Sequence, residues 1–168
     1  AGGSGLMSDA AFNAGTRSTP LGDRKAGQSA ALDALASYVA SLTTFAASPF
    51  RNADGTLTAA GTAGKAVFQA ANCTACHAGA GFTISSGAST LKNIGTLKPA
   101  SGQRLGAALP GLDVPTLRDV WATAPYLHDG SAPTLAAAVQ AHTGHTVAGT
   151  DLDHLVAYLQ QIGAEDSG

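Results

Sequence analysis

The sequence predicts an all-α fold in which helices surround a loop-rich middle. Three observations support this: four segments carry apolar residues at helical spacing, no segment alternates convincingly as a strand would, and Gly, Pro and Ser crowd residues 78–133. A loop of that length is uncommon inside a compact domain. It indicates either a function or a group other than side chains that fills the middle of the fold.

The first expected helix covers residues 29–47 and follows an irregular stretch rich in Gly, Ser and Thr. Its apolar residues recur at helical spacing, and Ser29 is placed to cap its start. A proline and an Asp-Gly turn then interrupt the pattern. We place a boundary there, which gives an N-terminal irregular segment plus helix over 1–50 and a main domain over 51–168.

Three further helices are expected in the main domain. The first begins near Thr58 and places Gly64 and Phe68 on one face, and the others cover 133–142 and 150–163. A glycine permits two helices to cross closely, and an aromatic side chain on the same face can reach the partner. The last helix offers that partner in three residues: Leu155, Tyr158 and Leu159. Thr150 and Asp153 resemble a capping box at its start, and Gly163 is a natural C-cap.

Charge and hydropathy exclude two classes of partner. The formal net charge is −2 and only 12% of residues are charged. No basic stripe is present, so nucleic acid is not an expected partner. The longest apolar runs are too short to span a bilayer, so we expect no membrane span in this chain.

Residues 73–77 read CTACH and contain both cysteines of the chain. A zinc site would need two more ligands at workable spacing, and His142 and His145 lie far along the chain with only two residues between them. A thioredoxin-like dithiol would follow a strand, whereas a helix is expected here. A structural disulfide across so short a loop would remove little entropy from the unfolded chain.

Covalent haem c uses all three residues of the motif at their observed spacing. Each thiol of Cys73 and Cys76 adds to one vinyl group of the porphyrin, and His77 coordinates the iron from the proximal side. A porphyrin also supplies the large apolar centre that a loop-rich middle requires. We therefore expect one covalent haem c.

The motif, the Gly64-x-x-x-Phe68 pair before it and the terminal LVAYLQQIG helix resemble a class I c-type cytochrome. More specifically, VPTLRDVWATAPYLHDGSAPTLAAAV (114–139) resembles the C-terminal haem domain of the bacterial di-haem cytochrome c peroxidase family, which includes rubber-oxygenase relatives. The resemblance covers about residues 58–163. It implies an all-α class I cytochrome c fold, with the helix at 29–47 as the remnant of a preceding domain.

The same resemblance suggests the second axial ligand. Peroxidases of this family carry a ligating methionine shortly after the T-L-x-x-A-V helix, and His142 falls at that position. His145 and Met7 are the alternatives. We expect His154 to be solvated and His128 to be a turn residue, although beside an open haem His128 could act as a distal acid–base group.

The haem propionates need hydrogen-bond donors. Arg118 suits a carboxylate by its planar fork, although a surface ion pair with Asp119 or Asp113 explains it equally well. Trp121 and Tyr126 each combine an apolar ring with one polar group and could line the pocket. The long loop supplies further apolar lining: Phe82, Ile84, Leu97, Leu105, Leu109, Leu112, Pro115 and Leu117.

These inferences favour a mono-haem domain that transfers electrons through a low-spin haem with two histidine ligands. The alternative is a peroxidase or oxygenase-type haem enzyme with an open or labile distal site. Redox proteins or domains are the expected partners. Because the family attaches haem outside the cytoplasm, we expect a periplasmic or secreted protein.

Overall fold

The computed structural model describes residues 29–85, 91–104 and 107–166 of the 168-residue chain. They belong to two compact units. The first unit includes the described residues up to Thr44 together with those between 102 and 109, and the second unit includes the described residues of 45–101 and 110–168. The described residues are mostly helical with little strand, which is consistent with a cytochrome c-like fold.

The first unit contains helix α2 (Ala30–Ser41). The Ser29 hydroxyl accepts a hydrogen bond from the backbone N–H of Leu32 at 3.4 Å, which confirms the predicted cap. The helix is shorter than the expected 29–47, because the N–H of Leu42 turns back to the carbonyl of Val39 and ends the regular pattern. Three large apolar side chains of the helix are solvent-exposed: Leu35 (56% exposed), Tyr38 (62%) and Val39 (57%).

The same unit contains a short antiparallel pair of strands, β1 (Gln103–Arg104) and β2 (Ala107–Ala108), which no pattern in the sequence predicts. Two residues per strand give too little alternation for a pattern to be recognised.

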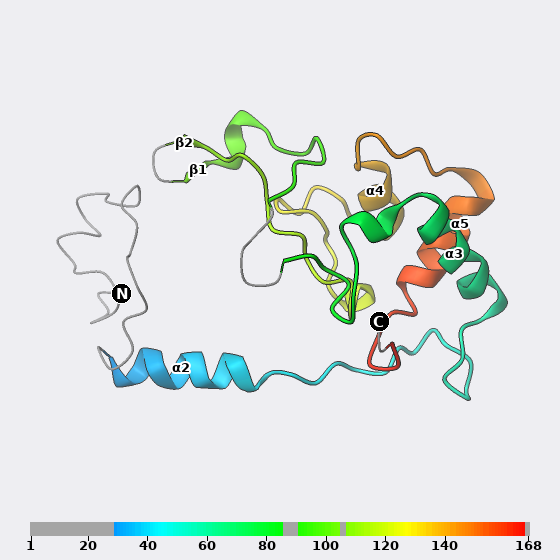
Figure 1. Ribbon diagram of the computed structural model, residues 1–168, viewed down its shortest axis with the longest axis horizontal. Coiled ribbons are helices and arrows are strands. Elements are labelled where there is room, and N and C mark those ends of the chain that lie inside the picture. The colour runs from blue at the N-terminus through cyan, green and yellow to red at the C-terminus, as the bar shows by residue number, and fades with distance from the viewer. Residues whose placement is uncertain (1–28, 86–90, 105–106, 167–168) are drawn as a thin grey trace. The chain divides into compact units, whose positions relative to one another are not determined.

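In the second unit, helices α3 (Ala59–Ala70) and α5 (Gly149–Leu159) lie side by side (Figure 1). A Cβ atom on Gly64 would lie 1.9 Å from the backbone oxygen of His154, so only glycine permits this crossing. The rings of Phe68 and Tyr158 meet edge-on with their centroids 5.4 Å apart. The predicted contact between these two helices is confirmed.

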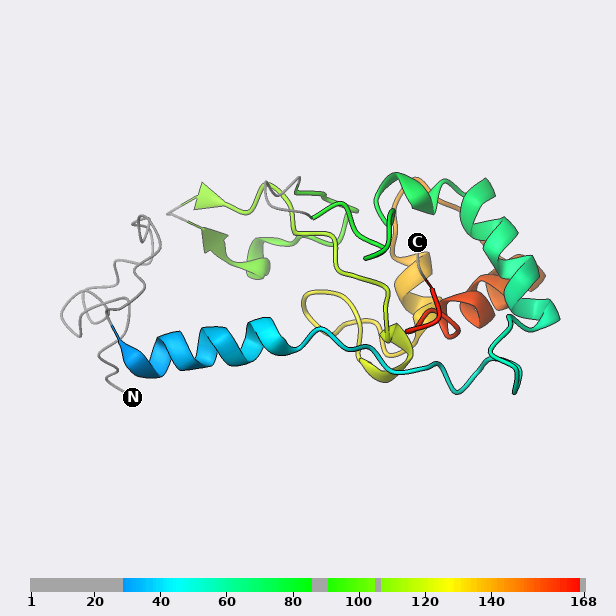
Figure 2. The same ribbon diagram turned by 60° about the horizontal axis from the view of Figure 1, so that its bottom comes forward.

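The hydrophobic core forms around this crossing. It combines side chains from α3, α5, the start of α4 and the loop after the cysteines: Phe68, Phe82, Leu135, Leu155, Tyr158, Leu159 and Ile162. Cys73 and several half-buried apolar residues of the long loops pack against the cluster. Figure 2 shows long loops between the helices of the second unit. This unit also contains the short 3-10 helix η3 (Pro99–Ser101).

Helix α4 (Leu135–Gln140) starts after Thr134, whose hydroxyl accepts from the N–H of Ala137 at 3.1 Å. It is shorter than the expected 133–142, so His142 lies in the turn that follows it.

Helix α5 differs from its expected bounds at both ends. Ala148 is its N-cap and no side chain caps it, so the expected capping box of Thr150 and Asp153 is wrong. The helix ends with Gln160 as C-cap, so Gly163 is not the C-cap. Gly163 is required for another reason: a Cβ there would lie 2.8 Å from the oxygen of Ala46, in the segment that crosses it.

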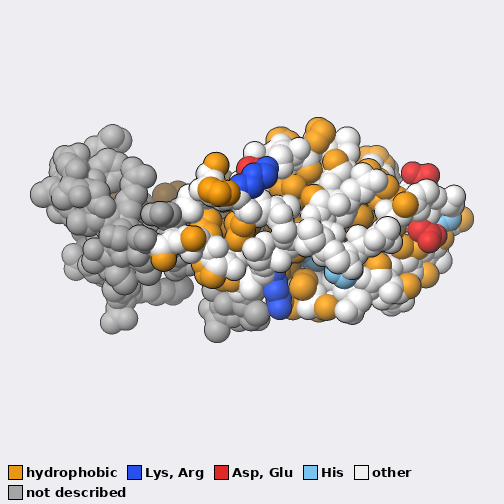
Figure 3. All heavy atoms as spheres, turned by 90° about the horizontal axis from the view of Figure 1, so that it is seen from above, with side chains coloured by type: hydrophobic (Ala, Val, Ile, Leu, Met, Phe, Trp, Pro, Cys, Tyr) orange, Lys and Arg blue, Asp and Glu red, His pale blue; other side chains and the backbone are white. Residues whose placement is uncertain are grey.

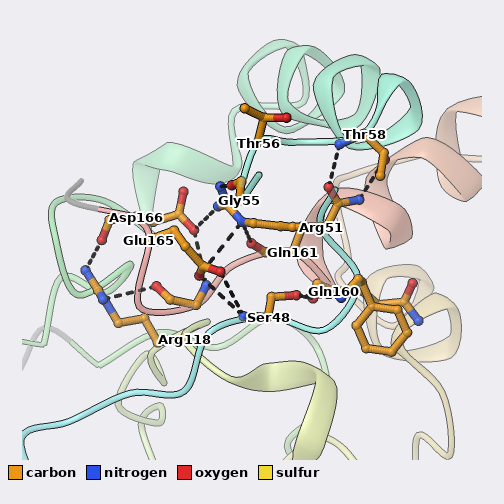
Figure 4. A network of polar contacts seen from close by, with 12 residues as sticks. Ser48, Arg51, Gly55, Thr56, Thr58, Arg118, Gln160, Gln161, Glu165 and Asp166 are labelled. Atoms are coloured by element: carbon orange, nitrogen blue, oxygen red, sulfur yellow. Dashed lines mark hydrogen bonds and ion pairs between the residues drawn. The ribbon is translucent and has the colours of Figure 1, made fainter. Parts of the chain in front are cut away.

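A network of polar contacts fastens the segment at 45–58 to the C-terminal turn at 160–166 (Figure 4). Arg51 donates to the carbonyl of Gln161 at 2.8 Å and pairs with Asp166 at 2.5 Å. Ser48 donates its hydroxyl to the carbonyl of Gln160 and its N–H to Glu165. These contacts close the second unit over the end of α5.

Charged side chains are sparse on the face seen in Figure 3, as the 12% charged composition predicts. Among the described residues, no helix has the length and apolar character needed to cross a membrane.

Candidate functional site

The cysteine motif follows α3 directly. Asn72 adopts a left-handed conformation (φ 57°), and the 3-10 helix η2 (Cys73–Ala75) begins after it. The N–H groups of Cys76 and His77 both donate to the carbonyl of Cys73, at 3.2 and 2.9 Å. This tight turn gathers the three side chains of the motif at the end of the helix.

Both cysteines are half-buried free thiols. Cys73 packs against the hydrophobic core, and this burial raises the pKa of its thiol above the usual value.

The ring of His77 is fixed by a backbone acceptor. Its Nδ1 lies 3.1 Å from the carbonyl oxygen of Phe82, which favours the tautomer with the proton on Nδ1. Burial lowers the pKa of His77, and the charge of His142 lowers it further. Hydrogen bonds with the backbone of Phe82 and Pro115 act in the opposite direction and raise it. The Nδ1 contact with Phe82 therefore holds the ring, and the backbone of Pro115 also interacts with the imidazole.

His142 is held in the same way. Its Nδ1 lies 2.8 Å from the carbonyl oxygen of Ala138, one turn earlier in α4. His142 is half-buried, and its charge is one of the causes that lower the pKa of His77. Both histidines expected as axial ligands are thus held at Nδ1 by a backbone carbonyl.

The other candidates for the distal position differ from this pattern. His128 is exposed and its Nε2 bonds with the hydroxyl of Ser101 at 2.9 Å, so that nitrogen is already engaged. His145 is exposed, beyond Gly144, and His154 is half-buried on α5 rather than fully solvated. Met7 lies outside the described residues.

The guanidinium of Arg118 contacts backbone carbonyls rather than either expected aspartate. It donates to Ala80 at 2.7 Å, to Gly163 at 3.2 Å and to the carbonyl of Asp166, and it stacks over the ring of Phe45 at 5.0 Å. Arg118 thus ties the loop after the cysteine motif to the C-terminal turn. A bond to a propionate would require one of these contacts to be exchanged, and that role stays a prediction.

Trp121 lies in the 3-10 helix η4 (Val120–Ala122) and meets Phe50 edge-on, with centroids 6.2 Å apart. Among the described residues, the indole Nε1 of Trp121 and the Oδ1 of Asp119 are the buried side-chain polar atoms without a hydrogen-bond partner. A buried unpaired donor is costly, so it marks a place for an acceptor. Tyr126 is half-buried against the core, and desolvation raises the pKa of its hydroxyl.

The residues expected to line the pocket from the long loop lie in several environments. Phe82 is buried in the core and Leu117 packs against it, whereas Pro115 is exposed. Leu105 lies outside the described residues, and Leu109 belongs to the other unit. Sequence reasoning missed the carbonyls of Phe82 and Ala138 that orient the two histidines, because a backbone acceptor leaves no signal in the residue type.

Comparison with known proteins supports the same class of site. A family model described as RoxA-like, cytochrome c-like matches residues 111–146, a span that contains His142 but not the cysteine motif. Hydrazine synthase subunit gamma of Kuenenia stuttgartiensis is 31% identical over 170 residues, covering 80% of this chain and 46% of that protein.

A solved structure of Kuenenia stuttgartiensis hydrazine synthase, pressurised with 20 bar xenon, superposes with a TM-score of 0.57 at 29% identity. The match covers 78% of this chain and 55% of that one, so the chain spans about half the length of these relatives. The resemblance to the peroxidase family stays a prediction. Together, the family model and the two relatives support a c-type cytochrome domain.

Proposed function

We propose that this chain is a mono-haem cytochrome domain that transfers electrons, with the haem attached through Cys73 and Cys76 and its iron held by His77 and His142. One observation carries the proposal: both imidazoles hold Nδ1 against a backbone carbonyl, so Nε2 is the nitrogen that each would offer to a metal. Metal-binding histidines usually donate their other N–H in this way, because the bond fixes the ring and raises its basicity.

Other features of the site fit a haem. The two thiols are free, Cys73 packs against the core, and the buried indole N–H of Trp121 lacks an acceptor that a propionate would supply. The haem would supply the one-electron chemistry. The chain would attach the macrocycle, hold both imidazoles in place and exclude water from the iron.

Two imidazole ligands have a measurable consequence for the reduction potential. A thioether ligand raises the potential of a c-type haem, and the proposed ligand pair lacks one. We therefore expect a potential below that of cytochromes with one histidine and one methionine ligand. A redox titration of the purified protein tests this, and a strongly positive potential would contradict it.

The direct test compares the wild type with His142→Ala, and uses His145→Ala as a matched control in the same loop. The wild-type protein, matured with haem outside the cytosol, should be low-spin in both oxidation states and should bind carbon monoxide slowly. His142→Ala should become high-spin and bind it rapidly, and His145→Ala should behave as the wild type. A spectral change in His145→Ala alone would move the ligand to His145.

A second function is an enzyme with an open or labile distal site, of the peroxidase or oxygenase type. The relation to a hydrazine synthase subunit favours it, because that relative is named as part of an enzyme. His128 would then serve as the acid–base group, released from Ser101. Rapid carbon monoxide binding by the wild type would support this function over electron transfer.

Protein partners and export complete the proposal. The relative named as subunit gamma belongs to an assembly, and we infer that this domain likewise exchanges electrons with a partner protein or domain. We also propose a periplasmic or secreted location and an N-terminal extension over 1–50 that derives from a preceding domain. Cell fractionation and limited proteolysis between residues 41 and 58 test these two statements.

A further inference from the structure

The loop that carries His142 is fastened at the next residue. The backbone N–H and the hydroxyl of Thr143 both donate to the carbonyl of Ile94, at 3.0 and 2.9 Å. Gly95, which follows, has φ +85°, and a Cβ there would lie 2.3 Å from the methyl carbon of Thr143. Only a glycine therefore allows the threonine to seat against the segment at 94–95. We call these three residues the Thr143 clasp.

The segment at 91–95 is itself anchored. Lys92 and Leu112 exchange both backbone hydrogen bonds, at 2.8 and 2.9 Å. A Cβ on Gly111 would lie 2.9 Å from the Cβ of Leu91, so the two segments are in close contact. The clasp therefore fixes the His142 loop to a braced segment.

Further contacts connect the segment around Leu112 to the loop that orients His77. Val114 accepts from the hydroxyl of Thr83 at 2.5 Å and donates to the hydroxyl of Ser85 at 3.0 Å. Thr83 directly follows Phe82, whose carbonyl holds the ring of His77. A continuous series of loop contacts thus links the turn that orients His77 to the loop that carries His142.

We propose that the Thr143 clasp is a positioning element that holds His142 at the distal position and sets how readily an external ligand displaces it. This inference rests on the proposed function. Two other contacts of His142 run back to α4: its Nδ1 meets Ala138, and its N–H donates to Val139 at 3.1 Å. The clasp restrains the backbone on the opposite side of His142, so a displacement of the imidazole that moves this backbone must break the contact with Ile94.

The main test uses Thr143→Val, which keeps the shape and the backbone N–H but loses the hydroxyl bond. A net hydrogen bond contributes about 0.5–1.5 kcal/mol, which corresponds to a factor of about 2 to 10 in an equilibrium. Carbon monoxide binding to the ferrous protein, limited by dissociation of His142, should therefore accelerate about 2- to 10-fold. Thr143→Ser should restore the wild-type rate. Thr123→Val is the matched control, because it removes an exposed hydroxyl bonded to the Val120 carbonyl at 3.2 Å.

A second variant tests the steric half of the clasp. Gly95→Ala inserts a methyl group against Thr143 and should accelerate carbon monoxide binding more than Thr143→Val does. Gly55→Ala is its control, because Gly55 has a similar φ of +80° but no atom within 4 Å of its Cβ position. Equal effects of the two substitutions would show that backbone strain, and not contact with Thr143, is responsible, which would overturn this half of the inference.

The His142→Ala background separates the clasp from the proposed function. There, Thr143→Val should have no further effect on the rate, because the ligand that it restrains is gone. If it accelerates binding equally in both backgrounds, the clasp does not act through His142. If the wild type is low-spin and Thr143→Val matches it, the clasp inference fails while the proposed function stands. If the wild type already binds carbon monoxide as fast as His142→Ala, the proposed function fails, and the clasp inference with it.

Discussion

Gly64→Ala tests the helix crossing on which the site depends. On an isolated helix this substitution would stabilise by about 1 kcal/mol, because alanine is the better helix former. Here the new Cβ would lie 1.9 Å from the backbone oxygen of His154 and 2.8 Å from the Cβ of Tyr158. Because the nearest atom belongs to backbone, no side-chain rotation relieves the overlap. The helices must separate by about 1 Å, which loosens the Phe68–Tyr158 contact.

Overpacking of a well-packed core costs about 1–3 kcal/mol and occasionally more, and backbone overlap belongs at the upper end. After the gain in helix propensity, we expect a net loss of about 2 kcal/mol in the free energy of unfolding. Urea denaturation of the holoprotein, followed by circular dichroism, measures it. Lys65→Ala, at the neighbouring exposed position, should change stability by less than about 0.5 kcal/mol. A Gly64→Ala protein as stable as the wild type would refute the reasoning.

Two further predictions concern the polar and aromatic groups around α5. Arg51→Met should destabilise by about 3 kcal/mol, because it leaves the nearly buried Asp166 carboxylate unpaired. Lys98→Met, at the exposed pair with Asp129, should lower the free energy of unfolding by less than about 1 kcal/mol in the same urea assay. Equal losses for Arg51→Met and Lys98→Met would contradict the view that burial makes the Arg51–Asp166 pair the more important one. Burial and the nearby Asp166 raise the pKa of Tyr158 to about 12. Because the folded protein holds the Tyr158 proton more tightly than the unfolded chain does, this proton stabilises the fold. The stabilisation is complete below pH 10 and is lost as the pH rises toward 12. Tyr158→Phe should remove that part of the alkaline loss, and an unchanged pH profile would count against it.

The sequence was sufficient to predict the elements whose signal is local. Gly64 and Phe68 stand four positions apart on one helix face, so their shared contact with the last helix could be inferred from spacing alone. The cap at Ser29 follows from residue type and position. The ends of α4 and α5 were less predictable, because apolar periodicity continues beyond the last helical hydrogen bond.

The contacts that the sequence could not predict join residues far apart in the chain. Arg51 and Asp166 are 115 positions apart, and no local pattern pairs them. The donors of Arg118 meet carbonyls rather than Asp119 or Asp113, and carbonyls are carried by every residue. The orientation of His77 and His142 likewise depends on backbone acceptors. The CTACH motif identified His77 as a ligand candidate and the family resemblance suggested His142, and only the folded chain places their Nδ1 atoms.

The central claim is that one covalently attached haem is held between His77 and His142. A near-infrared magnetic circular dichroism spectrum of the oxidised wild-type protein tests it most directly, because the charge-transfer band reports the pair of axial ligands. The account predicts the band of a low-spin haem with two imidazoles, which should be lost in His142→Ala. A band typical of histidine with methionine, or the spectrum of a high-spin haem in the wild type, would contradict it.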